Sequence, residues 1–397
     1  MKISIERPDP GTLNDMLNRI VERIQLTDTQ HNRATKVYEK VGRWLDETDS
    51  ELEPYEPRIY PQGSMLLQTT VRPMGEDGEA AEYDIDLVCQ LNVDADATHA
   101  NTLYNRIRDR LVLHDEYGDL VEEKGRCLRL GFEDDRMHLD VIPAAPDDRA
   151  QSATGILIPD KRTWTQRKLP RDTYKETDPT GFAEWFDAQC VVREATGRSM
   201  AQASMDPAPH REPVYAKAPL RKIVQLIKHR RNQEFLGEKE MPSSILITTM
   251  AARAYRGQAD LGVGLVDVLG AMDHDIKSAH PHRVAVPNPT NEDEDFADAM
   301  SDECYDRFSR MISDMRWEVV DAAGSGTQRL SIEPKLAKFA GQGVVAKAYN
   351  DLMSELNEAR DDGRLVVGGG GALSIGSGAS ASGHGRRVRD NTFHSNG

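Results

Sequence analysis

This sequence has few cysteines and no long apolar run. Its 397 residues include four cysteines, which lie far apart and form no C-x-x-C pair: Cys89, Cys127, Cys190 and Cys304. That spacing predicts reduced thiols in a cytoplasmic protein rather than a disulfide framework or a zinc site. No stretch reaches the roughly 18 consecutive apolar residues of a membrane span, and the N-terminus lacks the apolar segment of a secretory signal. We therefore expect no membrane partner.

Positive charge is outweighed by negative charge, with 50 lysine and arginine residues against 66 aspartate and glutamate residues. The net charge is −16, and no long basic cluster occurs before residue 386. Neutralisation of phosphates dominates binding to duplexes, so this balance argues against a nucleic-acid surface, and we expect neither DNA nor RNA to act as an activator. With 38% hydrophobic and 29% charged residues, the chain is typical of a soluble globular protein that is long enough for two domains.

The order of the sequence patterns predicts an α+β core followed by a helical domain. Residues 10–48 have the apolar spacing of one long amphipathic helix or two joined ones. Residues 83–92 alternate as a half-buried strand does, residues 98–113 have a helical pattern, and residues 126–132 and 136–142 form a hairpin pattern. Helical patterns then dominate, at residues 180–193, 216–235, 242–256, 261–272, 294–316 and 335–361.

We accordingly divide the chain into a core with its N-terminal helix at residues 1–159, a helical domain at 160–365 and a tail at 366–397. Residues 368–385 consist mostly of glycine and serine, which is typical of a flexible, disordered linker. The short basic run Arg386-Arg387-Val388-Arg389 follows it, and the chain stops at Gly397.

A flexible Gly63-Ser64 turn and three aspartates in strand-like segments are the candidate residues for a catalytic site. A Gly-Ser turn exposes backbone N–H groups that can bind a polyphosphate. Asp84 and Asp86 are separated by one residue, so on a strand they share a face, and Asp140 would join them from a neighbouring strand. Three hard oxygen ligands suit Mg²⁺, and two such ions activate a hydroxyl and stabilise a pyrophosphate leaving group.

The alternative is a plain turn with three unrelated surface carboxylates, since each motif alone is common. The combination is more specific. Asp140 lies inside the apolar sequence Met-His-Leu-Asp-Val-Ile-Pro, where a buried carboxylate without a partner would be costly. A metal ion removes that cost. The pattern therefore favours a metal-dependent nucleotidyltransferase site, with Asp84, Asp86 and Asp140 as both catalytic residues and metal ligands.

The segments Gln62-Gly63-Ser64, Asp84-Ile85-Asp86-Leu87 and Leu139-Asp140-Val141-Ile142-Pro143 resemble the polymerase-β-type nucleotidyltransferase superfamily. More narrowly, they are similar to the bacterial cGAS/DncV-like nucleotidyltransferases (CD-NTases) of CBASS anti-phage systems. The similarity continues through the segments that begin at Pro219, Pro242 and Val286, and it spans roughly residues 10–360. One departure is Gln68-Thr69-Thr70, where many relatives have Gly-Thr.

The resemblance implies a mixed-sheet polymerase-β-like core with a long N-terminal spine helix, packed on a C-terminal helical domain. It also implies that Gln62, Gly63 and Ser64 bind nucleotide. Lys228, at the border of an apolar helix stripe, would hold the donor triphosphate, although such lysines usually only cover apolar surface. Ser243 or Ser244 would bind the same phosphates, besides capping a helix.

The implied activity is the joining of nucleoside triphosphates, ATP or GTP, into a cyclic di- or trinucleotide messenger. Two Mg²⁺ ions, or Mn²⁺, would be the cofactors. Base identity, ring size and linkage stay open at this point. One alternative is a transferase that makes linear oligonucleotides or adenylylates a protein, and another is an inactive nucleotide-binding scaffold. Relatives with such tails also imply conjugation at Gly397 by an operon-encoded ubiquitin-like ligase, whereas composition alone fits a frayed terminus equally well.

Overall fold

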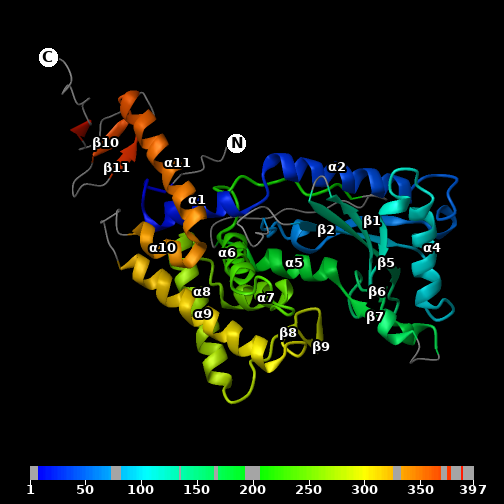
Figure 1. The fold of residues 1–397 in the computed structure, drawn as a ribbon. Coiled ribbons are helices and arrows are strands. Elements are labelled where there is room, and N and C mark those ends of the chain that lie inside the picture. Colours follow the sequence, from blue (N-terminus) through cyan, green and yellow to red (C-terminus); the bar gives the residue numbers. More distant parts are fainter. Residues whose placement is uncertain are drawn as a thin grey trace.

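The computed structural model describes eight stretches of the chain, which form a sheet-bearing lobe and a helical lobe (Figure 1). These stretches are residues 8–72, 82–133, 136–164, 169–192, 206–324, 332–367, 373–376 and 386–387. The predicted α+β architecture, with a mixed sheet and a helical second half, is confirmed.

The N-terminal segment forms two helices rather than one: α1 (Leu13–Ile24) and α2 (Asp28–Leu45). The Thr27 hydroxyl accepts from the backbone N–H of Gln30, whose side chain accepts in return from the Thr27 backbone. This capping box starts a new helix and explains the break. The apolar face of α1 joins the core of the helical lobe, whereas α2 covers the sheet. The segment therefore ties the two lobes together.

Seven strands form the main sheet, in the order β1-β2-β5-β4-β3, with β6 and β7 continuing from β5. Strands β2 and β5 run parallel at its centre, and the other pairs are antiparallel. The short helix α3 (Gly63–Leu66) follows β1 directly. The strands are β1 (Arg58–Gln62), β2 (Tyr83–Gln90), β3 (Val121–Glu123), β4 (Leu128–Phe132), β5 (Met137–Pro146), β6 (Ile156–Pro159) and β7 (Tyr174–Thr177).

The two faces of the central strands differ in chemistry because side chains alternate along each strand. On one face, Ile85, Leu87, Leu139 and Val141 are buried in a core completed by α2 and α4 (Ala100–Val112). The other face carries the aspartates that the sequence analysis selected. The predicted strand at 83–92 and the predicted hairpin at 126–142 are thus confirmed.

The helical lobe has a single large apolar core, to which α1 and most of the later helices contribute. Its helices are α5 (Pro179–Gln189), α6 (Pro219–Glu234), α7 (Ser244–Ala254), α8 (Leu261–Ala279), α9 (Asp302–Ala323), α10 (Ile332–Ala340) and α11 (Gln342–Asp361). No helix within the described ranges is long and apolar enough to cross a membrane. The four cysteines are free thiols, as predicted.

Two predicted helices need correction. The helix predicted at 294–316 begins too early. Residues 294 and 295 end strand β9 (Asn291–Asp295), which forms a hairpin with β8 (Pro287–Asn288), and α9 begins only after its N-cap Ser301. The helix predicted at 335–361 is divided into α10 and α11 by Gly341, whose φ is +88°. Glycine adopts that left-handed conformation without steric cost, which lets the chain turn between two helices.

Three short strands form a small separate sheet near the C-terminus, in the order β11-β10-β12 (Figure 1). They are β10 (Leu365–Val367), β11 (Leu373–Ile375) and β12 (Arg386–Arg387). The sequence predicted a tail without regular structure from residue 366, so this pairing is a difference from the prediction. Apart from Gly376, the other tail residues, including Gly397, lie outside the described residues.

Candidate active site

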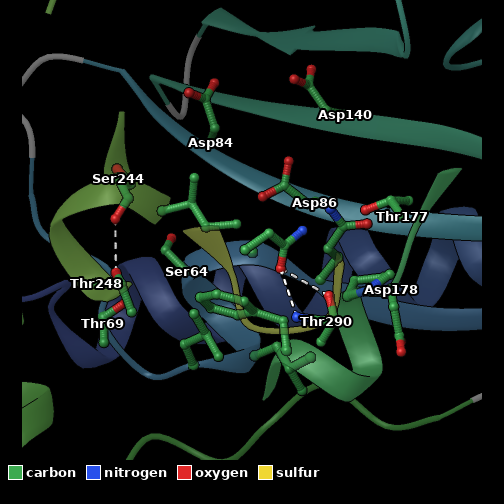
Figure 2. Close-up of a pocket in the computed structure, with 18 of the residues that line it drawn as sticks. Ser64, Thr69, Asp84, Asp86, Asp140, Thr177, Asp178, Ser244, Thr248 and Thr290 are labelled. Atoms are coloured by element: carbon green, nitrogen blue, oxygen red, sulfur yellow. Dashed lines mark hydrogen bonds between the residues drawn. The ribbon is translucent and has the colours of Figure 1, made fainter. Parts of the chain in front are cut away.

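The three predicted aspartates lie on two neighbouring rows of one sheet face. Asp86 of β2 is directly paired with Asp140 of β5, and Asp84 is paired with His138 one row further along the face. Figure 2 shows all three carboxylates along the same side of a pocket. The period-2 alternation and the parallel register are what bring residues 54 positions apart in the sequence together. We call these three aspartates the acidic wall.

A cavity of about 350 Å³ separates the acidic wall from the helical lobe. Both lobes contribute to its lining, which places it at their junction. Its lining residues are Gln62, Gly63, Ser64, Leu66, Leu67, Thr69, Asp84, Asp86, Asp140, Thr177, Asp178, Pro179, Phe182, Lys228, Ser244, Ile245, Thr248, Asn288 and Thr290. All the predicted site residues of the two lobes therefore line the cavity, except Ser243.

The Gly63 turn brings the chain against the acidic wall. Gly63 has a φ of +67°, and a Cβ atom built on it would lie 2.1 Å from Oδ2 of Asp86. Both facts require glycine here, because any side chain would be strained and would collide with the carboxylate. The next residue, Ser64, lines the cavity, and its Oγ lies 3.1 Å from Oγ1 of Thr70. Thr70 is part of the segment that departs from the family pattern.

Helix α6 supplies the opposite charge. Lys228 is only 3% exposed, and its Nζ donates to the backbone oxygen of Thr69 at 2.9 Å. Arg231, one turn later, donates from Nη1 to the backbone oxygen of Pro242 and to Oγ of Ser244. We call Lys228, Arg231 and Ser244 the basic wall, although Arg231 itself does not line the cavity. Burial lowers the pKa of Lys228 to about 7 and that of Arg231 to about 10.

The two predicted serines have different positions. Ser243 is the N-cap of α7, where its hydroxyl accepts from the backbone N–H of Leu246. That hydroxyl is occupied by capping, and Ser243 is not among the cavity residues. Ser244 lines the cavity, and Thr248 donates to its backbone oxygen (Figure 2). Of the two, Ser244 is therefore the residue placed to contact a ligand.

The acidic wall carries concentrated negative charge. Desolvation, followed by the charges of Asp140 and Asp84, raises the pKa of Asp86 to about 7. Desolvation also raises the pKa of Asp84, although its side chain is 55% exposed at the open side of the cavity. Carboxylates that raise one another's pKa in this way are stabilised by a bound cation.

A bound cation would have to compete with Arg129 of β4, which sequence reasoning missed. Its Nε and Nη2 donate to the two carboxylate oxygens of Asp140 at 2.8 and 2.9 Å, and Nη2 also lies 3.4 Å from Asp84. His138 lies near Glu82 and Asp84, but it does not itself line the cavity. Within the described stretches, no three acidic, histidine or cysteine side chains already form a metal-binding group.

Other residues of the cavity come from segments to which the sequence analysis assigned no function. Thr177 ends β7, Phe182 lies on α5, and Asn288 and Thr290 belong to the β8–β9 hairpin. Asp178 caps α5 and accepts from Gly181, so its carboxylate points away from the cavity (Figure 2). No local motif marks these residues, because only the folded chain brings them together.

The sheet order and the paired aspartates define a nucleotidyltransferase core of the polymerase-β type. Residues 12–189 match the family model described as the Second Messenger Oligonucleotide or Dinucleotide Synthetase domain. The chain is 28% identical to a c-di-GMP synthase of Roseivirga ehrenbergii over 366 residues, which cover 90% of this chain and 92% of that protein. It is 26% identical to the cyclic dinucleotide synthase CdnG of Bradyrhizobium diazoefficiens over 396 residues, which cover 92% and 90%.

Solved structures agree on the fold. The structure of the Bradyrhizobium diazoefficiens CD-NTase CdnG in complex with GTP matches with a TM-score of 0.67 and 24% identity, covering 86% of this chain and 99% of that one. The Vibrio cholerae DncV cyclic AMP-GMP synthase in complex with nonhydrolysable GTP matches with a TM-score of 0.57 and 16% identity, covering 81% and 93%. The family model and the two relatives support a synthetase of the cGAS/DncV type, and the solved structures share the fold of the CD-NTases.

Proposed function

We propose that this enzyme joins two purine nucleoside triphosphates, with GTP as the first to test, into a cyclic dinucleotide. The observation that carries the proposal is the acidic wall facing the basic wall across a cavity at the lobe junction. One wall suits metal ions and a reacting hydroxyl, and the other suits a triphosphate. The two curated relatives, a c-di-GMP synthase and CdnG, support a cyclic dinucleotide as the product.

The donor set of the acidic wall fits Mg²⁺ or Mn²⁺. Carboxylate oxygens are ligands that both ions accept, and the charges of Asp84 and Asp140 add to the raised pKa of Asp86, which a bound cation would counteract. Asp84 and Asp86 would hold the ion on the donor triphosphate, and Asp86 and Asp140 the second one. When bound, the ions would lower the pKa of the acceptor hydroxyl and neutralise charge on the leaving pyrophosphate.

The protein residues would position both reactants. The Gly63-Ser64 turn, Lys228 and Ser244 would hold the β- and γ-phosphates, so that pyrophosphate leaves in line with the attacking oxygen. Asp140 would accept the proton of the acceptor ribose hydroxyl. That oxygen forms a bond to the α-phosphorus as the bond to pyrophosphate breaks. A second transfer within the linear dinucleotide, which releases a second pyrophosphate, would close the ring.

Product analysis tests this function. Purified protein with Mg²⁺ and GTP, ATP or all four nucleoside triphosphates should give a dinucleotide that survives phosphatase and has the mass of a ring. The double variant Asp84→Asn/Asp86→Asn should give none. A product that phosphatase shortens would indicate the linear oligonucleotide alternative, and a labelled protein band would indicate adenylylation. No product under any condition, with nucleotide still bound, would favour the inactive scaffold.

In the cell, we propose that the messenger acts in anti-phage signalling of the CBASS type and needs no DNA or RNA activator. The tail would be attached through Gly397 to a target by a ubiquitin-like ligase. Deleting residues 388–397 leaves β12 in place, so it should preserve synthesis in vitro but abolish phage protection. Full protection by the shortened chain would argue against conjugation at Gly397. Strong stimulation of synthesis by duplex DNA at physiological salt would contradict the proposal that no nucleic-acid activator is needed.

A further inference from the structure

Arg129 occupies a special position in the sheet. In the antiparallel pairing of β4 with β5 it is directly opposite Asp140, and in the parallel pairing of β5 with β2 Asp140 is directly opposite Asp86. Arg129, Asp140 and Asp86 thus form one row across three strands, on the face that lines the cavity. The positively charged guanidinium of Arg129 therefore lies in the same row as two of the three proposed catalytic carboxylates.

The contacts of Arg129 involve the oxygens that a metal ion would need. Two parallel hydrogen bonds, of 2.8 and 2.9 Å, engage both carboxylate oxygens of Asp140, and a third contact of 3.4 Å reaches Asp84. Charge-assisted bidentate pairs of this kind are among the strongest polar interactions in proteins. A metal ion at Asp140 would approach the same lone pairs, and the guanidinium charge would repel it.

The surroundings leave the guanidinium room to move. The Arg129 side chain is 26% exposed, so it reaches solvent. The next residue of β4 on the same face is Gly131, and a Cβ atom built there would have a single neighbour within 4 Å, Cδ2 of His138 at 3.7 Å. Because no side chain occupies that position, the arginine can leave Asp140 without displacing the sheet.

We infer that Arg129 is a competitor for the divalent cation at Asp140, holding the carboxylate in the free enzyme and releasing it when the metal binds. This inference rests on the proposed metal-dependent function. It makes Arg129 a positioning residue that weakens metal binding to the empty site.

The test measures Mn²⁺ binding by electron paramagnetic resonance at fixed pH without nucleotide, so that it does not depend on activity. Arg129→Gln should bind Mn²⁺ about tenfold more tightly than the wild type, which corresponds to about 1.4 kcal/mol. Arg129→Lys keeps the charge but loses the bidentate pair, and it should fall between the two. The Arg129→Gln protein should also lose thermal stability in EDTA and regain it when Mn²⁺ is added.

The matched control is Arg126→Gln. Arg126 also makes two hydrogen bonds to one aspartate, of 3.0 and 2.9 Å to Oδ2 of Asp160, but neither residue lines the cavity. It should bind Mn²⁺ as the wild type does. Equal or weaker Mn²⁺ binding by Arg129→Gln would overturn the inference. A wild type that binds no Mn²⁺ even with a nonhydrolysable GTP analogue would instead contradict the proposed metal-dependent function, so the two failures are distinguishable.

Discussion

The two walls of the cavity are built on different principles. The acidic wall lies on strands, where the register places Asp86 opposite Asp140 and leaves Asp84 two residues away on the same face. The basic wall lies on helices, where Lys228 and Arg231 are one turn apart on α6 and Ser244 begins α7. Strand geometry concentrates like charges, whereas helix packing buries single cations. In the proposed function, the first arrangement would hold metal ions and the second would hold phosphates.

Burial has opposite effects on the two walls. It raises the pKa of Asp86 to about 7 and lowers the pKa of Lys228 to about 7, because a low-dielectric site disfavours either charge. The charge of Lys228 lowers the pKa of Asp86, and the charge of Asp86 raises the pKa of Lys228, so each opposes the other's shift. A triphosphate with its metal ions would supply both walls with partners at once. The free site is therefore electrostatically costly, and its ligand relieves that cost.

The largest expected effect is the loss of the acidic wall. Asp86→Asn should reduce turnover at least a thousandfold, because Asp86 is the proposed ligand shared by both metal ions. Steady-state synthesis of the product measures it. The control is Asp96→Asn, which removes a carboxylate from an exposed pair with Arg149. Substantial turnover by Asp86→Asn would show that the acidic wall does not hold the metals.

The basic wall should matter less. Lys228→Met should lower kcat/KM for GTP by roughly 10- to 150-fold, the value of one charged hydrogen bond of about 1.5–3 kcal/mol. Lys222→Met is a matched control, since Lys222 is a buried lysine of the same helix that donates to Asn18 away from the cavity. Equal losses in both variants would mean that Lys228 acts only through packing.

A smaller effect is expected where the two lobes meet. Lys175 of β7 donates to Glu294 of β9 at 2.5 Å, and Glu294 also accepts from Asn288, which lines the cavity. Lys175→Glu should raise the KM for GTP a few fold, because like charges would separate the elements that close the cavity. The double variant Lys175→Glu/Glu294→Lys should restore it. A double variant as impaired as the single one would rule out this ion pair.

The smallest effect concerns stability. The folded enzyme holds a proton on Asp86 more tightly than an unfolded chain with a pKa of 3.8, so ionisation of Asp86 destabilises the fold. That cost is complete above about pH 7 and disappears toward pH 4. In EDTA, Asp86→Asn should therefore have a higher Tm than the wild type at pH 8, by roughly 1 °C for each kcal/mol of that cost, and no advantage at pH 4. A gain independent of pH would contradict the assigned cost.

Local patterns in the sequence account for the acidic wall and for the architecture. Period-2 alternation places Asp84 and Asp86 on one face, and the apolar neighbours of Asp140 mark a buried strand. The basic wall was harder to predict, because a lysine at the edge of an apolar helix stripe is normally unremarkable, and only the resemblance selected Lys228. Its burial follows from the packing of α6 against the Thr69 segment, which no local pattern reveals.

The missed features depend on long-range pairing or on a competing local signal. Arg129 faces Asp140 only because β4 pairs with β5 in one register. A helix was predicted to begin at residue 294, but Asn288 accepts from the backbone N–H and the hydroxyl of Thr290, and the turn that results leads into strand β9 instead. Gly341 is the residue of the sequence that could have predicted the break between α10 and α11.

The proposed function requires the two walls to hold one ligand between them. A crystal structure with Mn²⁺ and a nonhydrolysable GTP analogue, with anomalous data for the metal, tests this directly. We predict Mn²⁺ within about 2.2 Å of carboxylate oxygens of Asp84 and Asp86, terminal phosphates next to Gly63 and Lys228, and Arg129 withdrawn from Asp140. Metal absent from the aspartates, or a triphosphate bound away from Lys228, would contradict the account.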